Sequence, residues 1–321
     1  MIRLLGMGNA LTDVLMPIGS DDILLELGLP KGSMQLINLE QFERISARVA
    51  DFPKHFVCGG SAANTITGAS KLGVKSVFIG KVFHDEVGLN YKEDLNYYGV
   101  DSFLLEGKQE SGQSLVFVSQ DGQRTFATFL GAAADLLPED IKPEFFQDST
   151  LFYIEGYLLQ NHELILKAVK MAREGGLKVA LDLASYNVVE DNLEFLKELI
   201  TSHVDIVFAN EEEAKALTGL QPAEALESIA AHVEIAVVKI GAQGAMAIRG
   251  NERVLVPAME ANCIDTTGAG DLFAAGFIYG MSIGLSLADC TRYGTITAGK
   301  VVEVIGPKMT NDHWTAIHAN F

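Results

Sequence analysis

The chain has 321 residues, of which 48% are hydrophobic and 21% charged, and its formal net charge is −18. This composition indicates a globular protein with a large core and excludes the disordered and fibrous classes. Because no stretch gathers Lys and Arg into a basic face, we expect neither nucleic acid nor an anionic membrane as a partner. Three cysteines without CxxC spacing predict neither a disulfide framework nor a zinc site, and they favour the cytoplasm as the location.

The chain opens with an apolar strand, Ile2 to Met7, which runs into the segment from Gly8 to Asp13. Gly6 and Gly8 do not make a dinucleotide fingerprint, because Leu11 stands where the third glycine belongs and no helical pattern follows. Asn9 and Asp13 are suited to holding substrate hydroxyls, but both residue types also favour simple turns. The residues alone leave these two interpretations open.

A glycine-led helix start follows the first part of the chain. The stretch from 21 to 38 is broken by glycines and a proline and predicts short strands and turns, and residues 39–50 have helical spacing. Then Gly59 and Gly60 would let a ligand approach the backbone closely, and Ser61 and Asn64 lie one helical turn apart on the same side. The helix continues to Leu72.

The segment from Gly68 to Ser76 is one residue out of register with a phosphate-binding P-loop, since Val74 stands where the lysine belongs. It predicts a helix that ends at Gly73 and a strand from Ser76 to Gly80, before another helix over 85–98. Two β-rich runs, 114–119 and 124–130, then flank Gln120-Asp121-Gly122-Gln123 and predict a hairpin. With the irregular stretch from about 17 to 38, this hairpin has too few residues for a core of its own.

From Pro138 onward, apolar strands alternate with helices. We expect strands at 151–154, 178–183, 206–209 and 235–240, and helices at 162–174, 193–202, 211–218 and 223–232. Such a series predicts a doubly wound, mostly parallel sheet with helices on both faces and ligands at the carboxyl ends of its strands. Two strand ends carry notable residues, Asn210-Glu211-Glu212-Glu213 and Lys239-Ile240-Gly241-Ala242-Gln243-Gly244. The three glutamates are also typical of a charged first helical turn.

The most informative stretch is Asp265-Thr266-Thr267-Gly268-Ala269-Gly270-Asp271, which leads into an apolar helix predicted over 272–288. A helix start has open backbone N–H groups and the positive end of the dipole, so it suits an anion. Asp271 beside such a cradle is placed to take a proton from a hydroxyl that attacks a phosphate. The alternative is a capped helix in which Asp271 or Thr267 satisfies the open amides. At 17 residues the run is too short to span a membrane.

This stretch and the following Leu-Phe-Ala-Ala-Gly-Phe resemble the C-terminal signature of the ribokinase-like (PfkB) family of carbohydrate and nucleoside kinases. Gly-Gly-x-x-x-Asn at 59–64 is similar to the family motif that clamps sugar hydroxyls. The resemblance implies that Asp271 is the catalytic base and that the amides of Gly268, Ala269 and Gly270 form an anion hole. It also implies a fold with an α/β domain over 1–16, 39–100 and 133–321, and a small β-sheet lid over 17–38 and 101–132.

The same resemblance implies ATP and Mg²⁺ as cofactors. Asn210 and Glu213 match an element associated with Mg²⁺ and phosphate through ordered water. Lys239, Gly241 and Gly244 match the nucleotide loop, although the family often has Thr where Lys239 stands. If a monovalent cation such as K⁺ is needed, it is expected at Asp265 and Thr267.

Within the family, residues 6–13, 34–37 and 153–157 resemble the adenosine kinase branch, whereas Ser111-Gly112-Gln113-Ser114 is similar to an element of the sugar kinases. The expected function is ATP-dependent phosphorylation of a primary hydroxyl of a nucleoside or sugar, by a monomer or homodimer. The alternatives are a ribokinase, fructokinase or ketodeoxygluconate kinase, or a non-catalytic sugar- or nucleoside-binding regulator. The residues expected to contact the acceptor are Asn9, Asp13, Gln35, Ile37, Gly59, Gly60, Ser61, Asn64 and Tyr157.

Overall fold

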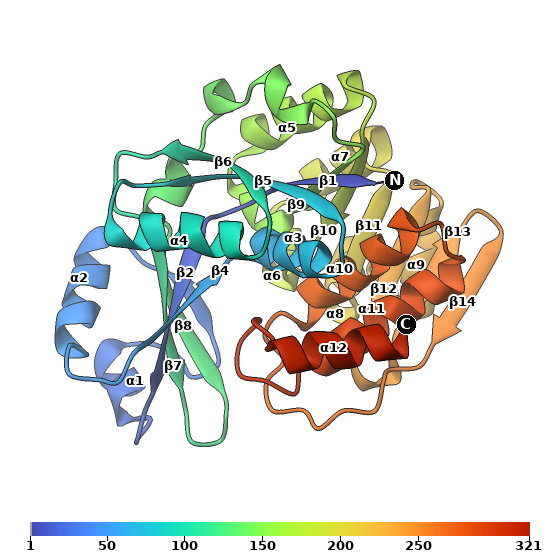
Figure 1. Cartoon of the computed structure of the whole chain (residues 1–321). Coiled ribbons are helices and arrows are strands. Elements are labelled where there is room, and N and C mark those ends of the chain that lie inside the picture. The colour runs from blue at the N-terminus through green and yellow to red at the C-terminus, as the bar shows by residue number, and fades with distance from the viewer. Residues whose placement is uncertain (1) are drawn as a thin grey trace.

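A computed structural model describes residues 2–321. Its centre is a nine-stranded sheet in the order β14-β13-β12-β11-β10-β9-β1-β5-β6 (Figure 1). The strands from β12 to β6 are parallel to their neighbours, and β13 and β14 add an antiparallel hairpin at one edge. The strands are β1 (Arg3–Met7), β5 (Lys75–Val82), β6 (Asp101–Glu106), β9 (Leu151–Glu155), β10 (Lys178–Asp182), β11 (Ile206–Asn210), β12 (Ile235–Lys239), β13 (Ala245–Arg249) and β14 (Glu252–Val256).

Helices cover both faces of this sheet, as the alternating pattern predicted. One face packs against α5 (His162–Glu174), α6 (Tyr186–Asp191), α7 (Leu193–His203), α8 (Glu211–Thr218) and α9 (Pro222–Ala230). The other packs against α3 (Ser61–Lys71), α4 (Glu86–Tyr97), α10 (Ala269–Ser282), α11 (Leu287–Val301) and α12 (Asn311–Asn320). Short 3₁₀ turns lie at Gly131–Asp135, Pro138–Asp140, Pro143–Phe146, Gly156–Gln160 and Gly241–Gln243. The predicted doubly wound α/β fold is confirmed.

A second sheet of five strands, in the order β3-β8-β7-β2-β4, stands beside the first (Figure 1). Its strands are β2 (Leu11–Pro17), β3 (Met34–Leu36), β4 (His55–Gly59), β7 (Gly112–Val118) and β8 (Arg124–Phe129). Helices α1 (Asp22–Leu27) and α2 (Leu39–Arg48) pack on one face of it and enclose a separate apolar cluster. We refer to this small sheet and its two helices as the lid, the name that the family resemblance suggests; that it closes over a site stays a prediction.

The predicted boundaries of the lid were wrong at three strands. β2 and β4 were assigned to the α/β domain but pair with each other in the small sheet, and β6 was assigned to the lid but pairs with β5 in the large sheet. Because α2 and β2 add their apolar residues, the lid also has a core of its own, contrary to the prediction. Met1, which was assigned to the α/β domain, lies outside the described residues.

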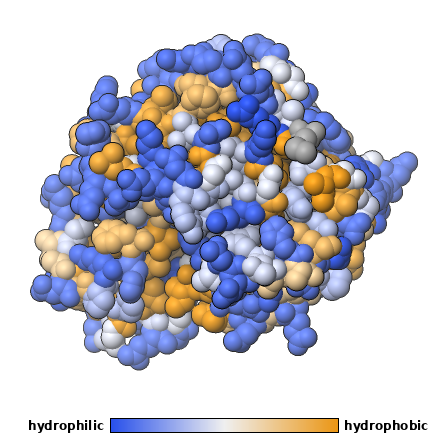
Figure 2. All heavy atoms as spheres, viewed as in Figure 1, coloured by the Kyte–Doolittle hydropathy of each residue, from blue (hydrophilic) through white to orange (hydrophobic). Residues whose placement is uncertain are grey.

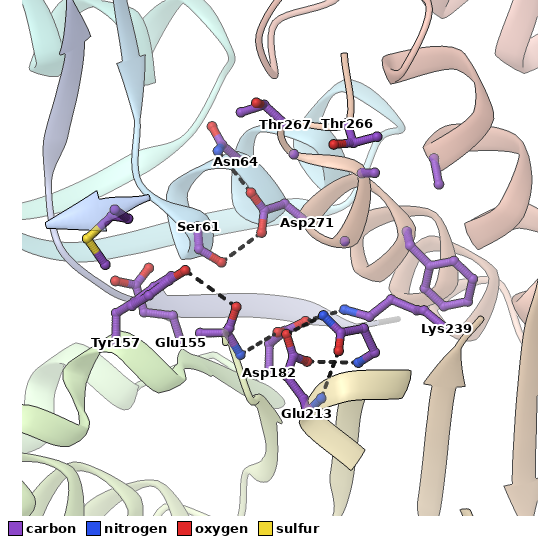
Figure 3. A pocket seen from close by; sticks show the side chains of 18 of the residues that line it. Ser61, Asn64, Glu155, Tyr157, Asp182, Glu213, Lys239, Thr266, Thr267 and Asp271 are labelled. Carbon is purple, nitrogen blue, oxygen red and sulfur yellow. Dashed lines mark hydrogen bonds and ion pairs between the residues drawn. The ribbon is translucent and has the colours of Figure 1, made fainter. Parts of the chain in front are cut away.

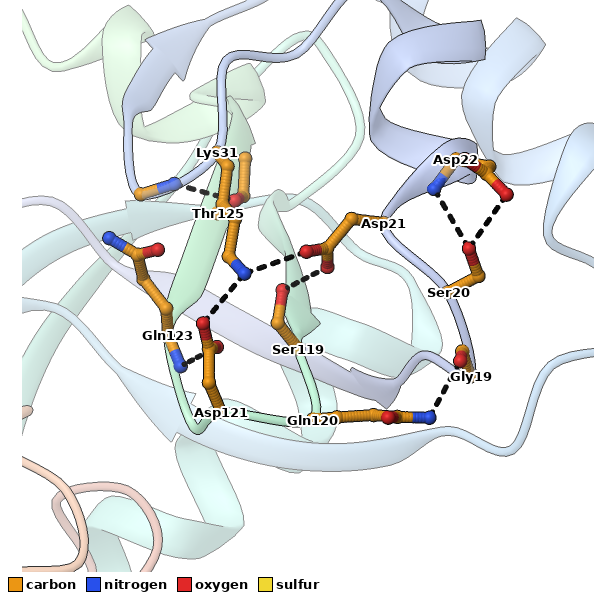
Figure 4. Close-up of polar contacts among 11 residues, drawn as sticks. Gly19, Ser20, Asp21, Asp22, Lys31, Ser119, Gln120, Asp121, Gln123 and Thr125 are labelled. Atoms are coloured by element: carbon orange, nitrogen blue, oxygen red, sulfur yellow. Dashed lines mark hydrogen bonds and ion pairs between the residues drawn. The ribbon is translucent and has the colours of Figure 1, made fainter.

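Polar contacts tie the tip of the lid together and to the main domain. Lys31 Nζ donates to Asp21 at 2.6 Å and to Asp121 at 2.7 Å, which joins the hairpin turn to the loop before α1 (Figure 4). Arg124, at the start of β8, forms an ion pair with Asp265, which precedes α10. Both of these side chains are only 7% exposed. The lid is therefore held against the main domain by a buried ion pair.

The apolar run over 272–288 is two helices and not the single helix that the sequence predicted. Gly284 adopts a φ of 77° after α10, and Ser286 caps α11 through Asp289. A left-handed glycine ends a helix because it satisfies carbonyls that would otherwise lack partners. The excluded P-loop is indeed a helix end and a strand, with Gly73 at a φ of 103° between α3 and β5.

Hydrophilic side chains cover much of the face in Figure 2, with apolar side chains in separate patches, including one over the small sheet. Within residues 2–321, the longest apolar helices fall short of the length and hydropathy that a membrane span requires.

Candidate active site

A cavity of about 1500 Å³ lies at the carboxyl ends of the parallel strands, between the large sheet and the lid. The ends of β9, β10, β11 and β12 each place a polar side chain in its wall: Glu155, Asp182, Asn210 and Lys239. The starts of α3 and α10, one face of the small sheet, α6, α11 and the loop after β14 also contribute to the wall. This is the edge at which a doubly wound sheet places ligands.

The start of α10 is open, and Asp271 lies in its first turn. Gly268 adopts a φ of 77° there, and within the described residues no side chain caps the helix. Asp271 instead accepts hydrogen bonds from Ser61 Oγ at 2.7 Å and Asn64 Nδ2 at 3.0 Å, both on α3 (Figure 3). The capped-helix alternative is therefore wrong, because neither Asp271 nor Thr267 satisfies the amides of α10.

The amides that can form the predicted anion hole differ from those expected at one position. The amide of Ala269 donates to the carbonyl of Thr266 at 3.1 Å, so it is already used. The amides of Gly270 and Asp271 come in the first turn, where no intrahelical acceptor exists. Within the described residues the amide of Gly268 also has no backbone acceptor, so the amides of Gly268, Gly270 and Asp271, and not that of Ala269, are available to an anion.

Burial raises the pKa of Asp271 to about 6, although the hydrogen bonds from Ser61 and Asn64 favour its charged form. A carboxylate in this range is ionised at neutral pH and can accept a proton, which is the condition for a general base. Ser61 and Asn64 line the cavity as predicted, but their donors serve Asp271 and not an acceptor.

Lys239 lies between Asp182 and the start of α10. Its Nζ is 3.0 Å from Asp182 Oδ2, and a Cβ added to Gly270 would lie 3.0 Å from the same Nζ. Burial opposes the charge of Lys239, but the carboxylates of Asp182 and Glu213 outweigh it and raise the pKa of the ammonium group. Asp182 Oδ1 accepts from the amide of Ala184, which has the left-handed φ of 68° that non-glycine residues rarely adopt.

Asn210 and Glu213 form a reciprocal capping box at the start of α8. Both carboxylate oxygens of Glu213 accept hydrogen bonds from Asn210, at 2.7 Å from Nδ2 and 2.8 Å from the backbone amide. Burial raises the pKa of Glu213 to about 7. Both residues line the cavity, as do Gly241 and Gly244 of the loop after β12. The glutamate run thus caps a helix and also faces the site.

Asn9 and Glu155 form a buried pair at the floor of the cavity. Glu155 Oε1 accepts from the backbone amide of Asn9 at 2.9 Å and from its Nδ2 at 3.0 Å, and Oε2 accepts from the amide of Ala62 at 2.6 Å. Within residues 2–321, Asn9 Oδ1 is buried without a partner. A buried orphan oxygen in a cavity wall suits a ligand hydroxyl. Gly60, with a φ of 90°, closes this corner, since a Cβ there would lie 2.3 Å from the carbonyl of Asn9.

Asp13 lies on β2, in the wall that the lid contributes. Burial raises the pKa of its carboxyl group to about 7. Gly59 does not line the cavity. It lies next to this carboxyl group, since a Cβ at Gly59 would lie 2.8 Å from Asp13 Oδ2. The predicted direct contact between Gly59 and an acceptor was therefore wrong, and Gly59 instead gives Asp13 its space.

The lid also supplies an apolar wall, and here the prediction was wrong by one residue. Side chains alternate along β3, so Met34 and Leu36 line the cavity while Gln35 and Ile37 point away from it, Ile37 into the lid core. Tyr157 lines the opposite side, and its predicted contact with an acceptor stays a prediction. The other apolar side chains of this end of the cavity are Leu11, Phe126 and Leu130.

Asp265 and Thr267 lie beside the cavity. Both oxygens of the Asp265 carboxylate already accept hydrogen bonds or pair with groups of the protein. Oδ1 accepts from the amide and hydroxyl of Thr267, and Oδ2 accepts from the amide of Gly306 and pairs with Arg124. A monovalent cation at Asp265 would have to compete with the guanidinium group of Arg124.

Residues 34–314 match the family described as pfkB family carbohydrate kinase. The chain belongs to this family. Its members transfer phosphoryl groups to sugars or nucleosides, and ATP and Mg²⁺ are their usual cofactors. The family resemblance predicted from the two glycine motifs is confirmed.

The chain is similar to solved structures of kinases over all or nearly all of its length. The adenosine kinase from Sinorhizobium meliloti is 36% identical, with a TM-score of 0.90 over 100% of this chain and 99% of that one. A probable sugar kinase from Rhizobium etli is 35% identical, with a TM-score of 0.91 over 99% and 98%. The 5-dehydro-2-deoxygluconokinase of Halalkalibacterium halodurans is 28% identical over 83% of this chain and 85% of its own length. The similar proteins thus include both nucleoside and sugar kinases.

The residues present fit the family's cofactors. The open amides of α10 and the ammonium group of Lys239 suit phosphate oxygens. Within the described residues, no three His, Cys, Asp or Glu side chains are grouped to hold a metal ion by themselves. Mg²⁺ would therefore be bound as this ion usually is, through substrate phosphates and one or two carboxylates.

Sequence reasoning missed Glu155, Asp182, Met34 and Leu36 as site residues. The signal for the two carboxylates was their position, since each is the last residue of a parallel strand. Met34 and Leu36 could have been found only by knowing which face of β3 points inward.

Proposed function

We propose that the chain is an ATP-dependent kinase that phosphorylates the primary hydroxyl of a nucleoside, with adenosine or a close relative as its acceptor. The observation that carries the proposal is the partly buried carboxylate of Asp271, which faces the cavity from an uncapped helix start and is held by two donors from α3. A carboxylate in that place has no role in capping and is suited to proton abstraction.

ATP with Mg²⁺ would supply the phosphoryl group, held by Gly241, Gly244, Asn210 and Glu213. Because both oxygens of Glu213 accept from Asn210, contact with the metal through water fits this pair better than direct coordination. Asn9 Oδ1 and Asp13 would bind acceptor hydroxyls. Asp271 takes the proton from the primary hydroxyl of the acceptor. The hydroxyl oxygen then forms the new bond to phosphorus as the bond to the departing ADP breaks. The amides of Gly270 and Asp271 donate to the oxygens of the moving group.

The end of the cavity near the lid is better suited to the nucleobase of a nucleoside than to a sugar acid. Its apolar side chains, Leu11, Met34, Leu36, Phe126, Leu130 and Tyr157, offer walls against which a flat ring can pack. Ser114 and Thr128 also lie there, but their hydroxyl groups form a hydrogen bond with each other at 2.7 Å. These hydroxyls therefore need no hydrogen bond from a ligand. Apart from Lys239, the described residues place no basic side chain in the cavity lining, so a substrate carboxylate such as that of 5-dehydro-2-deoxygluconate would lack a partner.

The test is a comparison of acceptors at equal concentration with ATP and Mg²⁺, read as ADP release. The set contains adenosine, inosine, ribose, fructose and 5-dehydro-2-deoxygluconate. We expect the highest kcat/KM with adenosine. A higher value with any free sugar or sugar acid would refute the nucleoside assignment. Tight adenosine binding without ADP release would instead identify a non-catalytic binder.

A further inference from the structure

Lys239 is an unusual residue in its surroundings. Of the described side chains that line the cavity it is the one basic group, whereas carboxylates line it in number, among them Asp13, Glu155, Asp182, Glu213 and Asp271. The chain as a whole carries a net charge of −18. A phosphate-bearing ligand that enters such a cavity needs positive charge at the place where its own charge is greatest.

Lys239 is placed where that charge would act. It is the last residue of β12, so its side chain starts at the carboxyl edge of the sheet. Its Nζ reaches the first turn of α10, within 3.0 Å of the Cβ position that Gly270 leaves empty. The ammonium group thus lies beside the first turn of α10, which carries the open amides of Gly270 and Asp271. Figure 3 shows Lys239 and Asp271 in the wall of the same cavity.

We propose that Lys239 is a catalytic residue whose ammonium group contacts the transferred phosphoryl group and, with the amides of Gly270 and Asp271, neutralises the charge on its oxygens during transfer. Asp182 acts as a positioning residue, since its carboxylate holds Nζ at 3.0 Å and is itself fixed by the amide of Ala184. This inference rests on the proposed function and adds a residue to it. Lys239 forms no covalent bond, so the bonds made and broken remain those of the transfer described above.

A purely structural ion pair between β10 and β12 is the competing explanation. It accounts for the bond to Asp182, whose side chain is 5% exposed, but not for the approach of Nζ to an uncapped helix start. The two explanations differ in what they predict for nucleotides. A catalytic Lys239 distinguishes a triphosphate from a diphosphate, because only the triphosphate has the group that is transferred. A structural Lys239 affects both nucleotides alike.

The test compares Lys239→Met with a matched control, Lys81→Met. Lys81 also forms a buried ion pair at the end of a strand, 2.6 Å from Asp140, but it lies outside the cavity. The dissociation constants of ADP and of the non-hydrolysable β,γ-imido analogue of ATP are measured by calorimetry with Mg²⁺, and kcat is measured with adenosine. If Lys239→Met does not fold because Asp182 is left unpaired, Lys239→Met/Asp182→Asn replaces it.

We expect Lys239→Met to lose about ten- to a hundredfold more affinity for the imido analogue than for ADP. Its kcat should fall about 10²- to 10³-fold, the usual effect of removing one transition-state donor. Lys81→Met should match the wild type in both measurements. An equal loss for the two nucleotides, or a kcat within threefold of the wild type, would overturn the inference. If the wild type phosphorylates no acceptor, the proposed function fails. The two dissociation constants then still show whether Lys239 contacts the terminal phosphate of the nucleotide.

Discussion

Replacing Asp271 with Asn should abolish most activity and at the same time stabilise the protein. Asn keeps the size of the side chain and can still accept from Ser61 Oγ. The carboxamide of Asn64 can turn over to accept from the new Nδ2, because Asn64 Oδ1 has no partner within the described residues. The site geometry is therefore retained while the base is lost. General-base catalysis contributes about 10²- to 10⁴-fold, so kcat should fall by about that factor.

The sign of the stability change follows from the pKa of Asp271. Burial raises this pKa from 3.8 to about 6 in the folded protein. The protonated carboxyl group therefore contributes its full share to the free energy of unfolding below pH 3.8, and this contribution is lost as the pH rises through 6. At 1.36 kcal/mol per unit, ionisation costs about 3 kcal/mol at pH 8. Weaker hydrogen bonds to the neutral amide offset part of this gain, since each contributes about 1 kcal/mol. The variant should be more stable by roughly 1–2 kcal/mol at pH 8, and by about 1 kcal/mol less at pH 5.

The assay measures kcat with adenosine and the thermal midpoint at pH 5 and pH 8 on one preparation. Asp289→Asn is the control, because Asp289 occupies the same position in the first turn of α11 and accepts from Ser286, but does not line the cavity. It should keep its kcat and lose a little stability. For the wild type, kcat/KM should rise with pH with an apparent pKa near 6. An Asp271→Asn protein with near-normal kcat, or one destabilised at pH 8, would refute the reasoning.

Three further perturbations follow from the lid and the nucleotide loop. Leu36→Asp should raise the KM for adenosine at least tenfold, whereas Gln35→Asp, on the other face of β3, should leave it within about threefold; equal effects would contradict the assigned face. Shortening residues 119–124 to a tight turn should raise ATP hydrolysis without acceptor, because it removes Arg124 and its ion pair to the main domain, and unchanged hydrolysis would count against a closing lid. Gly244→Ala should lower the thermal midpoint by several degrees, since its Cβ would lie 2.0 Å from the carbonyl of Val256. Gly250→Ala has open space and meets only the backbone strain of its φ of 58°, so it should cost less; similar midpoints would contradict this packing.

The sequence predicted the strands β1, β5 and β9 to β12 because buried parallel strands are continuous apolar runs, a signal that each segment carries by itself. It did not predict β6, β13 and β14, which lie at the edges of the large sheet. It predicted the start of α10 for a similar reason, since a glycine pair before an apolar run is local. The lid boundaries were wrong because the partner of a strand is not a local property. β2 and β4 belong to the small sheet because β2 pairs with both β4 and β7, and these partners lie far from it in the sequence.

Two further limits have equally physical causes. The choice of Gln35 and Ile37 over Met34 and Leu36 was wrong by one residue, which in a strand moves every side chain to the opposite face. Glu155 and Asp182 are single carboxylates without a motif, and they become site residues only because the strands that end in them lie side by side.

The most direct test of the central claim follows the γ-phosphoryl group itself. Wild-type protein is incubated with Mg²⁺, ATP labelled with ³²P in the γ-position, and either adenosine or 5′-deoxyadenosine, which lacks the primary hydroxyl. We predict that the label appears in AMP with adenosine, and that 5′-deoxyadenosine yields no labelled nucleoside. Label that remains in ATP, or that appears only as inorganic phosphate, would contradict the claim that this cavity transfers a phosphoryl group to a nucleoside hydroxyl.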